Sequence, residues 1–206
     1  LGSLEPWELP DGLWDHFANP RLMPHLHLPL QSGSNSVLRR MARRCRTEEF
    51  ANLVAEARAR VPGIHLTTDI IVGFPGETDA DFRATLEVVK TVGYASAFTF
   101  KYSPRPGTPA AESDKQISEA EKTARLHELQ RLVADQQTAF NASLVGRTIP
   151  VLLEKSGRFA GQLIGRSPYL QPVHLQADKG LIGTIVDTHI TGLGTNSLSG
   201  HYARAA

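Results

Sequence analysis

The stretch that decides the fold is Asp69-Ile-Ile-Val-Gly-Phe-Pro-Gly-Glu-Thr78, in which an apolar run ends in a glycine-rich turn. This pattern is typical of a buried strand followed by a tight loop. It places Glu77 at the carboxyl end of the strand, where α/β enzymes build their sites. The stretch therefore predicts a buried strand with functional side chains at its end.

Two similar strand ends flank this one along the chain. In residues 26–34 and again in residues 98–108, an apolar run breaks into polar residues and glycine. Segments with the apolar spacing of helices, 36–61 and 78–92, lie between the runs. Strands separated by single helices indicate parallel βαβ units, so we expect the three strand ends to share one rim. The expected strands are residues 26–30, 65–74 and 97–102.

The second half of the sequence has a different character. A long charged helix is expected over residues 117–144, because Ser118 is a good N-cap and an apolar stripe follows it. Beyond Gly146, β-branched residues alternate with polar ones between glycines, which predicts a small antiparallel β-barrel. We place the domain boundary between residues 143 and 144. The expected barrel strands are residues 148–154, 161–165, 173–175, 184–190 and 198–202.

Composition narrows the function classes. The chain has 206 residues, 41% of them hydrophobic, and a net charge of +1, so nucleic-acid binding would depend on local basic patches. No apolar run approaches the length a bilayer needs, and a cytoplasmic location is the expectation. A single cysteine, Cys45, excludes a disulfide framework and any multi-thiolate metal centre within this chain. The sequence starts at Leu1 without methionine and is expected to be a fragment.

Polar side chains at the first two strands are candidates for a binding site. Gln31, Ser32 and Ser34 offer neutral donors and acceptors beside a helix start, which suits a carboxylate, a ribose or a phosphate. The same residues are also usual in a tight turn before a capped helix. Asp69 lies in an otherwise apolar strand and must be paired or face a polar cavity. Its role as site residue or as structural partner stays open at this point.

The later strand ends leave similar alternatives. Glu77 can accept hydrogen bonds from a ribose or an amine, or it can cap its own helix, where a carboxylate gains roughly 0.3–1 kcal/mol. The segment 102–109 contains three prolines, which fix its backbone directions. Such a loop can bind an adenine edge through main-chain groups, or it can serve as a stiff linker.

Basic and imidazole side chains add two further predictions. Five arginines lie between residues 39 and 46 with no acidic residue among them, and several are expected on one helix face. This cluster favours RNA phosphates modestly over a solvated surface. His25 and His27 alternate along a strand, so both rings should point to the same side. We expect His27 to line the interior of the barrel that the parallel strands of the first half would form. There it would be a structural or substrate-contacting residue, rather than a metal ligand.

Three motifs together carry a family resemblance: HLHLPLQSGSNSVLRRM (25–41), TTDIIVGFPGET (67–78) and FTFKYSPRPGTPAA (98–111). In this order and spacing they resemble the radical S-adenosylmethionine (SAM) methylthiotransferases of tRNA. Residues 163–170 and 194–200 resemble the TRAM domain of the MiaB type, which acts on isopentenyladenosine. Residues 1–7 and 21–27 resemble the related MtaB type, which acts on threonylcarbamoyladenosine. The MiaB type carries more of the match.

The resemblance implies the later part of a TIM-like (βα) radical SAM barrel with a connector helix over residues 1–143, and a TRAM-like RNA-binding barrel over 144–206. It implies a transferase that methylthiolates C2 of the adenosine at tRNA position 37, using SAM and 4Fe–4S clusters. The family holds its clusters with a CxxxCxxC motif and three further cysteines, none of which stands in this chain. We therefore expect the chain alone to be inactive without a missing N-terminal cluster-binding part.

The resemblance also assigns candidate binding residues, but no catalytic or metal-binding ones. The tRNA anticodon stem-loop is the expected partner. The alternatives are a stand-alone tRNA-binding module without catalysis, or a cluster-free barrel enzyme that would have to work with His27, Asp69 and Glu77 on phosphorylated substrates. The candidates for SAM are Gln31, Ser32, Ser34, Asp69, Gly73, Glu77 and Tyr102. The candidates for RNA are Arg39, Arg40, Arg43, Arg44, Arg147, Lys155, Arg158 and Arg166.

Overall fold

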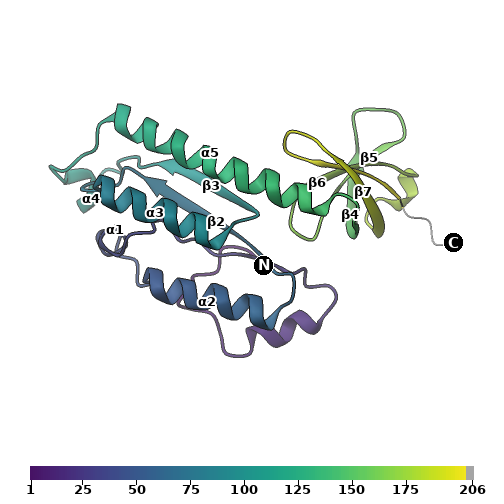
Figure 1. Ribbon diagram of the computed structural model, residues 1–206, viewed down its shortest axis with the longest axis horizontal. Helices are drawn as coiled ribbons and strands as arrows, with labels where there is room; N and C mark the ends of the chain where they lie inside the picture. Colours follow the sequence, from purple (N-terminus) through teal and green to yellow (C-terminus); the bar gives the residue numbers. More distant parts are fainter. Residues whose placement is uncertain (203–206) are drawn as a thin grey trace. The chain divides into compact units, whose positions relative to one another are not determined.

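The computed structural model describes residues 1–202, and the chain divides into two compact units (Figure 1). The first unit comprises Leu1–Gln137 and the second Thr138–Ala206. The last four residues of the predicted barrel domain, 203–206, lie outside the described residues.

The first unit is built on a parallel sheet of three strands. β1 (His25–His27), β2 (His65–Val72) and β3 (Ser96–Lys101) lie side by side in chain order. All pairs are parallel, so the strands end at one edge, as predicted. β1 is shorter than predicted because Pro29 has no N–H for the ladder. The next residue, Leu30, donates its N–H to the Thr68 hydroxyl instead, at 3.0 Å.

The prediction of a single helix over residues 36–61 is wrong. The chain forms α1 (Asn35–Arg40) and α2 (Thr47–Arg60), separated by a loop. The break occurs where Ala42 adopts a left-handed backbone with φ of 56°, which no right-handed helix accommodates. Thr47 is the first helical residue of α2, and the N–H of the capping residue Arg46 bonds the Glu49 carboxylate at 2.9 Å.

The helix after the glycine turn, α3 (Asp79–Val92), forms as predicted. Thr78 caps it: its hydroxyl accepts from the N–H of Asp81, and the Asp81 carboxylate accepts from the N–H of Thr78. Gly93 ends the helix with a left-handed φ of 61°. A short α4 (Pro109–Glu112) follows β3, and η1 (Leu13–Ala18) precedes β1.

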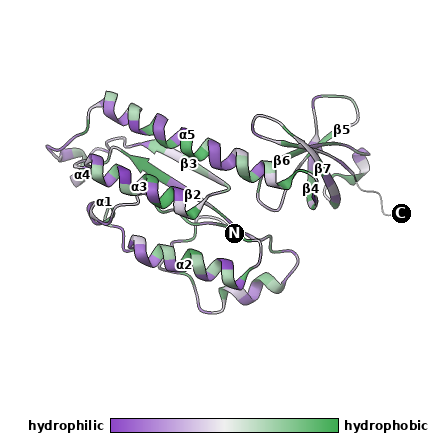
Figure 2. Ribbon diagram, in the orientation of Figure 1, coloured by the Kyte–Doolittle hydropathy of each residue, from purple (hydrophilic) through white to green (hydrophobic). Residues whose placement is uncertain are grey.

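The core of the first unit lies between the sheet and the apolar faces of its helices. The early part of α5 (Glu119–Leu144) contributes Leu129 and Val133 to it. Figure 2 shows β2 as largely hydrophobic, while α2 and α3 alternate hydrophobic and polar residues. This pattern buries one helix face and leaves the other to solvent. The largest fully buried side chains of this core are Tyr94, Phe50, Phe82, Leu26, Leu28, Leu66, Ile70 and Leu129.

The second unit is a closed barrel with strand order β4-β5-β6-β8-β7. Its antiparallel pairs match the prediction, but β6 and β8 pair in parallel. Along β4 the residues Ile149, Val151 and Leu153 point inward, which is the alternation that identified the strand. A Cβ on Gly165 would lie 2.5 Å from the Leu152 carbonyl oxygen, so only glycine permits this close strand approach. The elements are β4 (Thr148–Ser156), β5 (Gln162–Arg166), β6 (Pro172–Gln176), η2 (Lys179–Leu181), β7 (Ile185–Leu193) and β8 (Leu198–Tyr202).

Among residues 1–202, no helix is long and apolar enough to cross a membrane.

Candidate functional site

The serine turn after β1 is bound to the start of α3. Ser34 donates its hydroxyl to Asp81 Oδ1 at 2.5 Å, and Ser36 donates to the same oxygen at 2.6 Å. Burial opposes ionisation of Asp81, but hydrogen bonds from Ser34, Ser36 and Thr78 outweigh it and hold the pKa of this carboxyl well below its usual value. Asp81 is therefore a stable anion that orients both serine hydroxyls.

Close packing fixes the same turn. The N–H of Gly33 and the hydroxyl of Ser32 both contact Thr85 Oγ1, at 3.0 and 3.4 Å. A Cβ on Gly33 would lie 2.5 Å from Thr85 Cα, so the turn is pressed against the α3 backbone. Gln31, before it, is buried with φ of 70° and bonds β2 through its backbone on both sides. The candidate residues of this turn are thus held in place by protein contacts.

The glycine turn after β2 contains a buried ion pair that the sequence did not reveal. Arg125, from α5, places Nη1 2.6 Å from Glu77 Oε2 and also bonds the Glu77 carbonyl at 3.0 Å. The same carboxylate accepts the N–H of Gly73 at 2.6 Å. Burial raises the pKa of Glu77, and the hydrogen bonds from Gly73 and Arg125 offset this in part. The Glu77 carboxylate therefore stabilises the turn over residues 73–77.

Lys122, one turn before Arg125 on α5, holds the same turn from another side. A Cβ on Gly73 would lie 2.2 Å from Lys122 Cγ, and Gly73 has a left-handed φ of 72°. The Lys122 ammonium pairs with Glu119 at 2.5 Å and points to the Tyr102 carbonyl at 3.4 Å. Sequence reasoning treated this helix as a connector. Lys and Arg are rarely buried, so their burial three residues apart on this helix indicates a role at the turn, and the structure rather than the sequence reveals it.

Tyr102 follows β3 and presents an unsatisfied polar atom. Its N–H bonds the Val72 carbonyl at 2.8 Å, and its ring packs edge-on against Phe74 with centroids 5.1 Å apart. Its hydroxyl is buried with no hydrogen-bond partner among the described residues. Buried hydroxyls are normally hydrogen-bonded, so this one fits a bound group that supplies the missing partner.

A polar and aromatic cluster spans one face of the sheet. His25 Nε2 and His27 Nδ1 both lie within 3.0 Å of Thr67 Oγ1, so the two rings share a side as their alternation predicts. His27 Nε2 lies 3.4 Å from Asp69 Oδ2, which gives Asp69 a partner. The Phe98 ring packs edge-on to His27 with centroids 6.0 Å apart, yet it is 59% exposed. Burial lowers the pKa of His25 to about 4.

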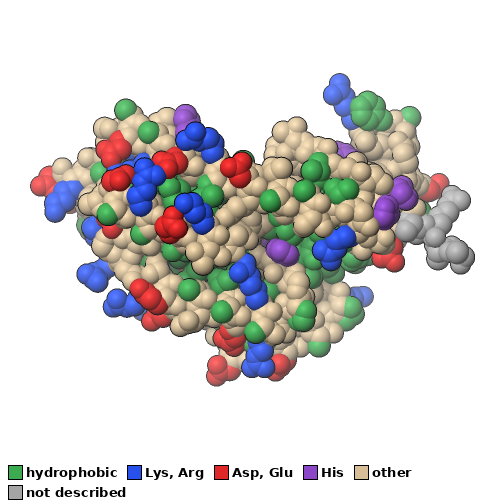
Figure 3. Space-filling model, in the orientation of Figure 1, with side chains coloured by type: hydrophobic (Ala, Val, Ile, Leu, Met, Phe, Trp, Pro, Cys, Tyr) green, Lys and Arg blue, Asp and Glu red, His purple; other side chains and the backbone are tan. Residues whose placement is uncertain are grey.

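The arginines after β1 do not form one helix face, contrary to the prediction. Arg39 and Arg40 lie on α1, whereas Arg43 and Arg44 lie in the loop that follows. Arg40 bonds the Gly76 carbonyl at 3.0 Å, and Arg43 pairs with Glu5 at 2.9 Å. Arg39 and Arg44 are exposed, with no ion pair among the described residues. Figure 3 shows basic and acidic side chains interspersed over the first unit, in keeping with the net charge of +1.

The basic candidates of the barrel are all exposed: Arg147, Lys155, Arg158 and Arg166. Arg166 pairs with Glu154 at 3.0 Å and extends toward the Leu170 carbonyl. The other three form no ion pair within the described part of the chain.

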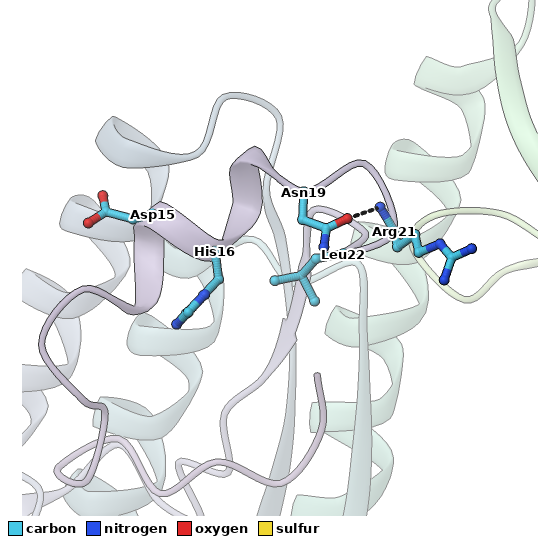
Figure 4. A pocket seen from close by; sticks show the side chains of 5 residues that line it. All are labelled: Asp15, His16, Asn19, Arg21 and Leu22. Atoms are coloured by element: carbon cyan, nitrogen blue, oxygen red, sulfur yellow. Dashed lines mark hydrogen bonds between the residues drawn. The ribbon is translucent and has the colours of Figure 1, made fainter.

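The donor set of this chain does not fit an iron–sulfur cluster. Cys45, its one cysteine, is buried, and burial raises the pKa of its thiol to about 11, which disfavours the thiolate that binds metal. Within residues 1–202 no group of three His, Cys, Asp or Glu side chains is placed to hold a metal ion. The hollow in Figure 4 is lined by Asp15, His16, Asn19, Arg21 and Leu22, none of which is a predicted site residue.

Comparisons with known proteins agree with this architecture. Residues 7–89 match the Radical SAM superfamily, and residues 142–203 match the TRAM domain. The chain is 52% identical over 196 residues to a tRNA-2-methylthio-N(6)-dimethylallyladenosine synthase of Maricaulis maris. That match covers 95% of this chain but 43% of the relative, so the chain spans less than half of the relative's length.

A solved structure supports the fold. Coproporphyrinogen III oxidase (HemN) from Escherichia coli, a radical SAM enzyme, matches 98% of this chain and 50% of its own, with a TM-score of 0.54 and 16% identity. At that identity the likeness shows the fold alone. The two domain matches and the 52% identity together support a MiaB-type methylthiotransferase as the kind of protein that this chain resembles.

Proposed function

We propose that this chain is the C-terminal part of a tRNA methylthiotransferase that modifies C2 of isopentenyladenosine beside the anticodon. The observation that carries the proposal is the 52% identity over 196 residues to a synthase of that name. The two domain matches within the same span support it. A cytoplasmic location follows from a tRNA substrate.

The strand ends of the first unit are proposed to bind SAM. Tyr102 would donate its unpartnered hydroxyl to the bound molecule, beside the Gly73 turn that Lys122 packs against. Glu77 would act through its turn, because Arg125 and Gly73 already occupy its carboxylate. Gln31, Ser32 and Ser34 would shape the neighbouring wall, oriented by Asp81 and Thr85.

The chemistry that SAM supplies in this superfamily is a carbon radical, whose generation requires an iron–sulfur cluster. The donors for that cluster are not offered by this chain, so they must come from another part of the enzyme. The proposed role of the residues of this chain is to bind and orient SAM and the tRNA. We propose that the open face with His27, Asp69 and Phe98 receives the adenine base, since it offers a carboxylate acceptor beside an exposed ring.

The tRNA is proposed to contact the barrel unit through Arg147, Lys155, Arg158 and Arg166, with Arg39 and Arg44 as exposed cations on the first unit. Arg40 and Arg43 contribute less, because each already has a partner inside the unit. Binding of this kind depends on phosphates and on RNA shape, and it falls steeply with salt. The anticodon stem-loop is the segment we expect to be bound.

A chimera tests the proposal. The N-terminal part of the Maricaulis maris relative, joined to this chain, is expressed in cells that lack their own enzyme, and tRNA nucleosides are analysed by mass spectrometry. Methylthio-isopentenyladenosine is expected. Methylthio-threonylcarbamoyladenosine in its place would assign the MtaB reaction. Neither product from a folded chimera, with tRNA binding intact, would favour a stand-alone RNA-binding module.

A further inference from the structure

The loop between β4 and β5 displays the most exposed large hydrophobic side chain of the described residues. Phe159 is 64% exposed, more than any other residue of its kind in residues 1–202. It lies outside the barrel core and is in none of the aromatic pairs described for that unit. Phe159 therefore presents its ring to solvent, where a binding partner can reach it.

The backbone of the loop holds Phe159 outward. Gln162 Oε1 accepts the N–H of Arg158 at 3.1 Å and lies 3.5 Å from the N–H of Phe159, so one side chain fills the inside of the turn. A Cβ on Gly157 would lie 2.5 Å from the same oxygen, and Gly161 has a left-handed φ of 72°. The turn is therefore preorganised, which lowers the entropy cost of binding through its tip.

Two cations lie close to Phe159 in sequence. Arg158 precedes Phe159, Lys155 lies at the end of β4, and both are exposed without an ion pair among the described residues. Arg166, by contrast, is neutralised by Glu154. Figure 3 shows a basic and a hydrophobic side chain next to each other on the projecting part of this unit. An exposed phenyl ring with two unpaired cations within four residues of it matches a base with its adjoining phosphates.

We infer that the β4–β5 loop is an RNA-binding tip, in which Phe159 stacks on an unpaired base while Arg158 and Lys155 contact neighbouring phosphates. This inference rests on the proposed function, which makes the barrel a tRNA-binding unit, and it adds the mode of contact. Stacking needs a base that is free of its helix, so the tip binds an RNA loop or bulge rather than a duplex.

The test measures binding of a fluorescently labelled tRNA stem-loop, and of a blunt duplex of equal length, to the full chain across a salt series. Phe159→Ala should weaken stem-loop binding about 10-fold. Phe159→Trp should bind within about twofold of the unmodified chain, since indole also stacks. Arg158→Ala should reduce the slope of the logarithm of the binding constant against the logarithm of the salt concentration by about 1. Phe159→Ala should leave that slope unchanged. Ile185→Ala, at a position 54% exposed on β7, is the matched control and should not change binding.

Two substitutions distinguish ring stacking from a contact that needs only an apolar side chain. Phe159→Leu keeps an apolar side chain without a ring and should behave like Phe159→Ala. Fluorescence of the Phe159→Trp chain should be quenched by the stem-loop and not by the duplex. Circular dichroism melts check that each variant is folded.

Three results would count against the inference, each in a distinguishable way. Equal stem-loop affinity of Phe159→Ala and the unmodified chain overturns the stacking tip, while tRNA binding and the proposed function stand. Full affinity of Phe159→Leu overturns stacking in favour of a simple apolar contact. Absence of all RNA binding by the folded, unmodified chain overturns both the tip and the RNA role of the barrel. The nucleoside analysis of the chimera is independent of all three.

Discussion

Arg125 and Glu77, which are 48 residues apart, form a buried ion pair in which Nη1 lies 2.6 Å from Oε2 and the two side chains are 6% and 1% exposed. The pair ties the long helix α5 to the glycine turn after β2. That turn is part of the proposed SAM site, so its position depends on a residue far along the chain.

Replacing Arg125 by methionine should destabilise the first unit by about 3–5 kcal/mol, because it leaves the Glu77 carboxylate buried without a counter-charge. Urea unfolding followed by circular dichroism measures the loss. Arg125→Met combined with Glu77→Gln should recover part of it, since the uncompensated charge is gone. Arg131→Ala, at an exposed position of the same helix, is the control and should change little. An Arg125→Met loss as small as that of the control would show that the pair contributes no stability.

The buried histidine His25 should make stability depend on pH. Its folded pKa is lowered to about 4 by burial, whereas in the unfolded chain its pKa is near the ordinary value of 6.5. The contribution of neutral His25 to the unfolding free energy is therefore fully present above pH 6.5 and is lost as the pH falls toward 4. The cause is that His25 takes up a proton in the unfolded state at a higher pH than in the folded state. The unfolding free energy should fall by up to about 1.4 kcal/mol per pH unit in this window from His25 alone. His25→Gln, measured over the same pH range, should flatten the curve; an unchanged slope would contradict the assignment.

A methyl group at Gly33 should disturb the serine turn. The Cβ of Gly33→Ala would lie 2.5 Å from the Thr85 Cα, and a helix backbone cannot move aside as a side chain can. We expect a loss of about 1–3 kcal/mol in unfolding free energy. Gly2→Ala serves as the control, since nothing lies within 4 Å of its added Cβ. Equal stability of the two variants would mean that the turn and α3 separate at little cost.

The unpartnered hydroxyl of Tyr102 leads to opposite expectations for stability and binding. Tyr102→Phe removes a buried polar atom that makes no hydrogen bond among the described residues, so the chain should keep its stability or gain up to about 1–2 kcal/mol. In the chimera the same change should weaken SAM binding, measured by calorimetry, because the proposed donor is lost. Clear destabilisation with unchanged SAM affinity would place the hydroxyl in the core rather than in the site.

Local patterns predicted most of the fold. The apolar spacing over residues 78–92 identified α3, and the alternation along β4 identified a barrel strand. The break after α1 was missed because it depends on a left-handed Ala42, a conformation that alanine gives no sign of in sequence. The parallel pairing of β6 with β8 was missed because it follows from barrel closure, which no single strand specifies.

The site was predictable where it depends on neighbours in sequence and not where it depends on distant ones. Alternation alone placed His25 and His27 on one side of β1. By contrast, the contacts of Lys122 with the Gly73 turn join segments about a quarter of the chain apart, and periodicity carries no such information. The same holds for Asp81, because nothing in the sequence around it indicated the two serines that it binds.

Every described strand of the second unit has a neighbour on both sides, so the backbone of these strands offers no open edge to another chain. Recognition must then pass through side chains and connecting loops. The turn closed by Gln162 is such a loop: the side chain of Gln162 bonds the N–H of Arg158, while the Gly161 carbonyl accepts the N–H of Ala177. Changes at the exposed tip of this loop can therefore alter what the unit contacts without altering the strands of the barrel.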